Sequence, residues 1–195
     1  MYRAAGLHPS GGASPLALAN GLLGPGSVLS YHASSLPGDG ALAWVAGKPR
    51  IYIRSRLSPA RRRFAICHEL AEWCLTLARY QEPDIEQLAN ALGAALLAPR
   101  QLFLRVLRAD GRNLPLLAGH LGTTESCAAL RLGETTDLPL ALIAPRRPVR
   151  VRGAEFSWPG EDAIRRMAAG RVAPGLARTK LRDDPRRVVL AAANR

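Results

Sequence analysis

The sequence predicts an α+β protein, and three stretches of the chain support that prediction. Residues 41–53 read ALAWVAGKPRIYI, in which apolar, aromatic and β-branched residues flank a turn signal. Over residues 58–97, apolar residues recur at three- and four-residue steps, which is the period of amphipathic helices. Beyond residue 137 the pattern changes to short apolar runs that are typical of strands. We therefore expect a hairpin, a helical middle and a strand-rich end.

Composition favours one ordinary domain with a small appendage. The chain has 195 residues, of which 48% are hydrophobic and 22% are charged. It has no run of 18 apolar residues, so we expect no membrane span. The first residues, MYRAAGLHPSGGASP, lack the apolar centre of a secretory signal, so the expected location is cytoplasmic.

The predicted organisation has three parts. Residues 1–14 are rich in Gly, Ser and Ala and predict a flexible N-terminus. Residues 15–136 form the main domain, which includes a helical segment at 100–136, and residues 137–195 form a basic C-terminal appendage. Within the main domain a short helix is expected from Pro15, because Ser14 is a good N-cap and proline suits the first helical position.

A β-hairpin and two helices are expected next. In residues 41–53 the turn is placed around Gly47-Lys48-Pro49. The first helix starts after Ser58, with Pro59 in its first turn. The second spans residues 84–97 and is ended by Pro99.

Residues 100–133 predict further helices, among them residues 114–120 and 126–132 on either side of a turn at 121–124. This outline is similar to a helix-turn-helix that reads DNA, but ordinary helix packing produces the same outline. The sequence favours packing, because no aromatic-interleaved basic motif or phosphate-binding loop accompanies it. Direct nucleic-acid binding therefore stays an alternative.

The C-terminal appendage is expected to be strand-rich and basic. Strands are predicted in residues 138–145, 149–153 and 187–191, and a short helix in residues 162–169. Residues 146–195 hold 13 Lys and Arg against 5 Asp and Glu, a net +8 out of the +12 of the whole chain. This excess predicts a surface that contacts an acidic partner.

The stretch FAICHELAEWCL (64–75) contains the residues that matter most for function. On a helix, His68 and Glu72 face the same side and can point at one ion, while Glu69 stands beside them. A third ligand is available in Glu86 if the two helices run antiparallel after a loop near 79–83. This reproduces the two-helix arrangement of zinc peptidases that carry H-E-x-x-H. The alternative is a solvated, charged helix edge.

These residues carry a family resemblance. The run RFAICHELAE (63–72), followed by EQLANALGAALLAP (86–99), resembles the ImmA/IrrE metallo-endopeptidases, whose pattern is R-F-x-x-x-H-E-x-x-H and then E-x-x-A-[ND]-x-[FL]-[AG]-x-x-L-L-x-P. The hairpin at 41–53 and the stretch 121–132 also fit. The resemblance covers about residues 15–135.

The resemblance implies a gluzincin-like fold: a zincin-like core with an N-terminal β-hairpin, two active-site helices and a helix-turn-helix-like segment. It implies a zinc site in which His68, Glu72 and Glu86 are ligands and Glu69 is the general base. Asn90 would orient a ligand from the second helix. The implied activity is cleavage of a protein partner, in several members a transcriptional repressor.

Glu72 is a departure from the family, which has histidine at this position. A glutamate reaches the same point, since zinc accepts carboxylate oxygen at ~2.0 to 2.2 Å. Two carboxylates, however, weaken the pull of the ion on water and open the site to Mn²⁺ or Fe²⁺. Two rival hypotheses thus remain: a catalytically inactive member that binds a regulator, and a DNA-associated regulator that uses residues 113–132 and the basic end.

Overall fold

We describe the fold from a computed structural model of the chain. The described residues are 1–8, 14–32, 38–81, 83–136, 140–143, 150–152, 164–165, 169, 176–180 and 188–192. The chain forms two compact units. Unit 1 comprises Met1–Ala109 and His120–Thr123, and unit 2 comprises Asp110–Gly119 and Thr124–Arg195.

The start of the chain makes specific contacts within unit 1. Arg3–Ala5 forms a short 3-10 helix, η1, and the preceding Tyr2 is buried. The hydroxyl of Tyr2 donates a hydrogen bond to the backbone oxygen of Leu96 at 2.5 Å. Residues 9–13 of the expected flexible N-terminus lie outside the described residues. The first residues are thus joined to a distant helix, a contact that no pattern in the sequence indicated.

Helix α1 spans Pro15–Leu23, as the sequence predicts. Ser14 caps it, because its side-chain oxygen accepts a hydrogen bond from the backbone N–H of Ala17 at 3.1 Å. Leu18 and Ala19 are its buried apolar residues.

The sheet of unit 1 has the strand order β1-β3-β2. Strands β2 (Gly40–Val45) and β3 (Lys48–Arg54) form the expected antiparallel hairpin. The turn, predicted around Gly47-Lys48-Pro49, lies at Ala46 and Gly47, which have φ of 49° and 74°, and Lys48 and Pro49 belong to β3. Strand β1 (Val28–Tyr31), which was not predicted, pairs with β3 in parallel. Strand β2 therefore lies at an edge of the sheet.

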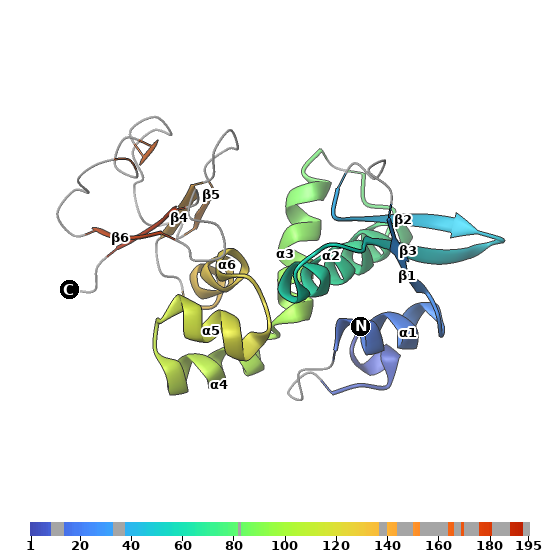
Figure 1. Ribbon diagram of the computed structural model, residues 1–195, viewed down its shortest axis with the longest axis horizontal. Helices are drawn as coiled ribbons and strands as arrows, with labels where there is room; N and C mark the ends of the chain where they lie inside the picture. The colour runs from blue at the N-terminus through green and yellow to red at the C-terminus, as the bar shows by residue number, and fades with distance from the viewer. Residues whose placement is uncertain are drawn as a thin grey trace. The chain divides into compact units, whose positions relative to one another are not determined.

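Helices α2 (Pro59–Leu77) and α3 (Ile85–Leu97) have the bounds that the apolar periodicity indicated. They lie side by side, with the sheet against α2 (Figure 1). A left-handed residue ends α2: Arg79 has φ of 54°, and the N–H of Tyr80 donates to the oxygen of Leu75 at 3.0 Å. This backbone pattern reverses the chain direction after a helix.

Three further helices follow: α4 (Arg100–Asp110), α5 (Leu114–Leu121) and α6 (Glu125–Thr136). Their positions agree with the helical segment that the sequence predicts. Thr124 caps α6, because its hydroxyl oxygen accepts from the N–H of Cys127 at 3.2 Å. No described helix is long and apolar enough to cross a membrane.

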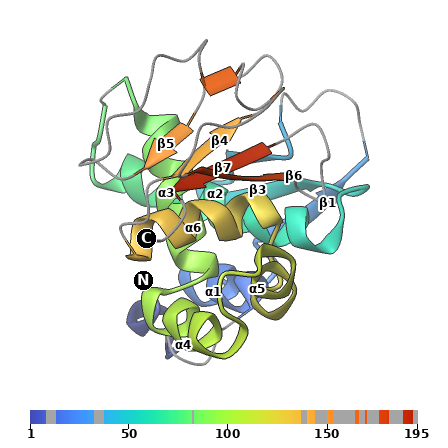
Figure 2. The ribbon, with the colours of Figure 1, turned by 90° about the vertical axis from the view of Figure 1, so that its left-hand side faces the viewer.

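The sheet of unit 2 has the strand order β5-β4-β7-β6, and all its neighbours are antiparallel. Figure 2 shows α6 passing along this sheet, in keeping with its contacts to β4 and β5. The strands are β4 (Leu140–Ile143), β5 (Arg150–Arg152), β6 (Leu176–Lys180) and β7 (Val188–Ala192). Strand β6 was not predicted, and only residues 164, 165 and 169 of the expected helix at 162–169 are described.

Candidate metal centre

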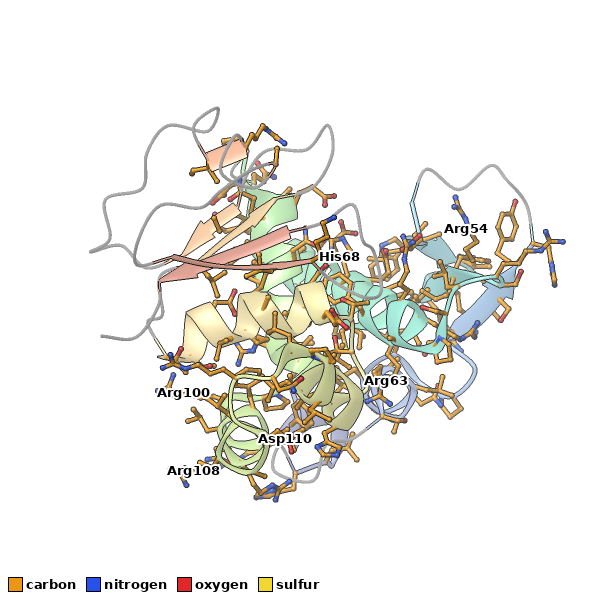
Figure 3. The ribbon with its side chains drawn as sticks, turned by 60° about the vertical axis from the view of Figure 1, so that its left-hand side comes forward. Arg54, Arg63, His68, Arg100, Arg108 and Asp110 are labelled. Carbon is orange, nitrogen blue, oxygen red and sulfur yellow. The ribbon has the colours of Figure 1, made fainter. Side chains whose placement is uncertain are left out.

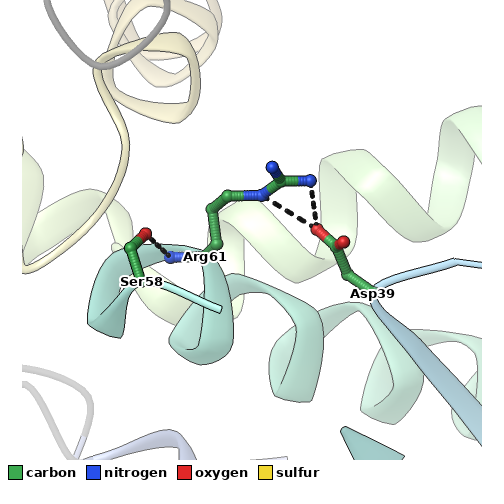
Figure 4. A network of polar contacts seen from close by, with 3 residues as sticks. All are labelled: Asp39, Ser58 and Arg61. Atoms are coloured by element: carbon green, nitrogen blue, oxygen red, sulfur yellow. Dashed lines mark hydrogen bonds and ion pairs between the residues drawn. The ribbon is translucent and has the colours of Figure 1, made fainter. Parts of the chain in front are cut away.

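The first turn of α2 is held against the start of β2. Ser58 caps α2 by accepting a hydrogen bond from the N–H of Arg61 at 3.4 Å. The guanidinium of Arg61 in turn donates to Asp39, with its Nε at 3.0 Å and its Nη2 at 2.6 Å from the same oxygen, Oδ2 (Figure 4). Asp39 directly precedes β2, so this partly exposed ion pair joins the start of β2 to the first turn of α2.

Two turns further along α2, the three predicted ligands come together. The Nε2 atom of His68 lies 3.4 Å from Oε1 of Glu72 and 3.8 Å from Oε2 of Glu86. The three ligand atoms all lie within 4.8 Å of one another. Figure 3 shows His68 on α2, and Glu86 reaches it from the first turn of α3. Among the described residues, this group of three has the spacing that a metal ion needs.

These separations fit a small divalent ion. Ligand atoms that surround a tetrahedral ion at about 2.1 Å lie about 3.4 Å from one another. The His68–Glu72 and His68–Glu86 distances of 3.4 Å and 3.8 Å are close to that value. One imidazole with two carboxylates is a donor set that zinc accepts. The side chains therefore need little movement to hold an ion between them.

The three ligands differ in exposure. The side chains of His68 and Glu72 are 16% and 29% exposed, whereas that of Glu86 is 71% exposed. Burial lowers the pKa of His68, but the hydrogen bond to Glu72 and the charges of Glu69, Glu72 and Glu86 outweigh it, so the pKa is raised. The hydrogen bond from His68 lowers the pKa of Glu72 more than burial raises it. The side of the site on α2 is thus partly enclosed, and the side on α3 faces solvent.

Glu69 is a buried carboxyl group beside the candidate ligands. Its Oε2 has no hydrogen-bond partner within the described part of the chain. Burial and, after it, the charge of Glu72 together raise the pKa of Glu69 to about 7, although the charge of His68 opposes both. A carboxyl group with a pKa near neutrality can both accept and release a proton.

Gly40 makes room for this carboxyl group. A Cβ atom added to Gly40 would lie 2.7 Å from Oε1 and 3.1 Å from Cγ of Glu69. Gly40 and the neighbouring Asp39 belong to no motif in the sequence. Their importance follows only from how β2 lies against α2, and the order Asp-Gly is otherwise an ordinary turn signal.

The predicted supporting role of Asn90 takes an unexpected form. Its side-chain nitrogen donates to the backbone oxygen of Glu86 at 2.6 Å. Asn90 therefore supports the helical turn that carries Glu86, and this contact does not involve the Glu86 carboxylate.

The second ring nitrogen of His68, Nδ1, is buried and has no partner within the described residues. Metal-ligating histidines normally donate a hydrogen bond from this second nitrogen.

Comparisons with known proteins identify the family and the fold of the chain. The model of the peptidase M78 family, described as the IrrE N-terminal-like domain, matches residues 26–133. A solved structure of a Mycobacterium tuberculosis transcriptional regulator is similar, with a TM-score of 0.60 and 14% identity over 98% of this chain and 84% of that chain. No curated protein matches the chain significantly. The structural likeness confirms the α+β fold that the sequence predicts.

Proposed function

The chain belongs to the peptidase M78 family of IrrE N-terminal-like domains, and on that premise we propose that it is a metal-dependent endopeptidase that cleaves a protein partner. The observation that carries the proposal is the convergence of His68, Glu72 and Glu86 within 4.8 Å beside the buried Glu69. Zinc is the proposed metal, and Mn²⁺ or Fe²⁺ are alternatives because two of the three ligands are carboxylates.

In this proposal each residue has a defined task. His68, Glu72 and Glu86 hold the ion, which when bound supplies Lewis acidity toward water and the scissile carbonyl group. Glu69 accepts a proton from the attacking water at its carboxylate and then gives it to the leaving amine. The enclosed position of Glu69 limits the access of bulk water to that proton.

The proposed substrate is a protein involved in transcriptional control, and a helix-turn-helix repressor is the specific candidate. Family resemblance supports this choice, and so does the printed name of the structural neighbour, a transcriptional regulator. The net +12 charge of the chain favours an acidic protein surface. The same positive charge could also bind DNA directly, and we favour this function less.

A second candidate function is that of an inactive member, which binds a regulator without cleaving it. The specific observation that favours it is Glu72, because a second carboxylate lowers the net charge of the site. The unpartnered Nδ1 of His68 also favours it, since the usual support for a metal-ligating histidine is missing within the described residues.

One set of variants decides between the two functions. We expect the natural chain to bind one zinc per molecule, and Glu86→Ala to lose most of it, with the neighbouring exposed Gln87→Ala as the matched control. Elemental analysis after dialysis measures this. If the natural chain retains no stoichiometric metal at neutral pH, the metal centre is absent and the proposal fails.

Peptide hydrolysis is tested next. The substrates are a library of quenched fluorescent peptides and repressor proteins that are encoded beside the gene for this chain. Glu69→Gln should abolish cleavage and leave the metal content unchanged, because this residue transfers a proton and is not a ligand. Glu72→His should tighten zinc and increase cleavage. Cleavage by Glu72→His but not by the natural chain would identify the inactive member.

A further inference from the structure

The sheet of unit 1 has two different faces, and the sequence of β3, KPRIYIR, contributes to both, because side chains along a strand alternate between faces. Ile51 and Ile53 of β3 are fully buried. Gly40, which pairs with Ile53, lies against α2, since a Cβ atom added to it would be 2.7 Å from Oε1 of Glu69. This inner face therefore packs on α2. The outer face receives the alternate residues of β3, which are Lys48, Arg50, Tyr52 and Arg54.

The two neighbouring strands add apolar and aromatic side chains to the outer face, because paired residues on adjacent strands share a face. Leu29 of β1 pairs with Tyr52 and is 39% exposed. Val45 of β2 pairs with Lys48 and is 45% exposed. The ring of Tyr31, from β1, packs edge to face on Tyr52 at a centroid distance of 6.3 Å. The outer face thus combines cations, aromatic rings and exposed aliphatic side chains.

The charge of the outer face has one sign. Strands β1, β2 and β3 contain no Asp or Glu, and their cationic residues are Lys48, Arg50 and Arg54. The guanidinium of Arg50 donates to the backbone oxygen of Gly26 at 3.1 Å, and this neutral acceptor does not cancel its charge. Asp39, directly before β2, forms an ion pair with Arg61 of α2. The outer face is therefore complementary to an acidic surface.

We propose that the outer face of the unit 1 sheet docks an acidic segment of the protein partner. The inference deepens the proposed function, since the partner is the protein that the chain cleaves or binds, but docking itself needs no metal. Tyr and Arg are the residues that protein interfaces favour, and cations orient an acidic partner. Single-stranded nucleic acid fits less well, because bases stack on open rings, whereas Tyr31 and Tyr52 are half-buried and packed together.

The experiment measures how the full chain binds a fluorescein-labelled random copolymer of Glu and Tyr, by fluorescence anisotropy in low salt. Lys48→Glu reverses an exposed charge of the outer face. Arg108→Glu is the matched control, because it changes the net charge equally at an exposed position of α4. We expect the dissociation constant to rise about fivefold for Lys48→Glu and less than about twofold for Arg108→Glu. No binding by the natural chain, or equal losses in the two variants, would overturn the inference.

A second pair of variants tests the apolar part of the outer face. Val45→Ser removes an exposed aliphatic side chain from it, and Leu116→Ser removes one from α5, where Leu116 is 49% exposed. Val45→Ser should weaken copolymer binding about threefold, and Leu116→Ser should leave it unchanged. Salt does not screen apolar contacts, so this difference should persist in 1 M NaCl. A difference that disappears in high salt would show that only charge acts, and the face would not be a docking surface.

Two further measurements separate the alternatives. A single-stranded oligothymidylate that binds more tightly than the copolymer, and loses affinity in Lys48→Glu, would show that the face binds nucleic acid and that the inference is wrong. Zinc content is measured in the same proteins. Copolymer binding that depends on Lys48 and Val45 in a chain without zinc upholds the inference and overturns the proposed peptidase. A chain that holds zinc but binds the copolymer independently of both residues overturns the inference alone.

Discussion

The two helices that supply the candidate ligands differ in how firmly their ligand-bearing parts are held. On α2, His68 lies between the fully buried Cys67 and Leu70, and the first turn is attached to the sheet through Arg61. On α3, Glu86 stands in the first turn, where Asp84 occupies the N-cap position without a side-chain capping hydrogen bond. One half of the site is therefore preformed, whereas the other half depends on the fit between helices and on the ion itself.

The substitution with the largest expected effect removes a buried side chain from α2. Leu70→Ala deletes a fully buried side chain, and such substitutions lower the free energy of unfolding by about 2 to 5 kcal/mol. Leu92→Ala on α3 is the matched control, because Leu92 is already 37% exposed, and we expect a loss below about 1 kcal/mol. Urea unfolding monitored by circular dichroism measures both. Equal losses would show that the burial of Leu70 contributes no more to stability than an exposed leucine on α3.

Zinc should reduce the difference between the helices. At a free zinc concentration one hundred times the dissociation constant, binding stabilises the native state by about 2.7 kcal/mol. Hydrogen exchange should slow most at the amides of residues 87–90 in α3, and little at those of residues 65–71 in α2. Glu86→Ala should remove the protection of α3. Protection centred on α2 would mean that α3 is already fixed without metal.

The far end of α3 is anchored by Tyr2, and this anchor should depend on pH. Burial raises the pKa of Tyr2 to about 12 from its ordinary value of 10. The neutral phenol is the form that the fold favours, so its contribution is complete below pH 10 and is lost as the pH rises toward 12. Tyr2→Phe should lower the free energy of unfolding by about 1 kcal/mol at pH 8, and its stability should no longer fall between pH 10 and pH 12.

The free energy of unfolding is measured by urea at pH 8, 10 and 11 for the natural chain and for Tyr2→Phe. Tyr52→Phe is the control, and it should lose stability at alkaline pH as the natural chain does. Identical pH dependence in all three proteins would show that the Tyr2 phenol does not titrate with folding.

The smallest expected effect concerns the ion pair that holds the start of α2. Arg61 and Asp39 are 55% and 30% exposed, so water and salt screen their attraction. Asp39→Asn should lower stability by about 0.5 kcal/mol or less in low salt and by nothing measurable in 1 M NaCl. A larger, salt-independent loss would indicate that Asp39 stabilises β2 by another route.

The sequence predicted the helices of the site well, because period and caps are local properties. Ser58, Pro59 and the apolar steps define α2, and Pro99 defines the end of α3. Strand β1 was missed, since its four residues, VLSY, show no clear alternation and pair with a strand that does not follow it directly in the chain. Strand β6, LARTK, was missed because it contains a single large apolar residue and no apolar alternation, although its partner β7 is the next strand along the chain.

The candidate ligands and Asn90 could be chosen from spacing and resemblance, but the contacts that support them could not. Gly40 matters because a side chain there would strike Glu69, and that depends on the distance between β2 and α2. Asn90 was expected to orient a ligand, but its hydrogen bond to the backbone of Glu86 was not expected. Contacts of this kind have no periodic pattern along the chain, so inspection of the sequence does not find them.

The chain reversal at Arg79 also has a consequence for the order of folding. It lets His68 and Glu86, which are only eighteen positions apart in the sequence, approach each other across one helical hairpin. Short loops close quickly and at low entropic cost, so this hairpin can form before the strands of unit 2 have paired. During synthesis the strands of unit 1 (28–54) leave the ribosome before residue 86, and β4 to β7 leave it afterwards. The three candidate ligands can therefore meet while the chain that forms the sheet of unit 2 is still being made.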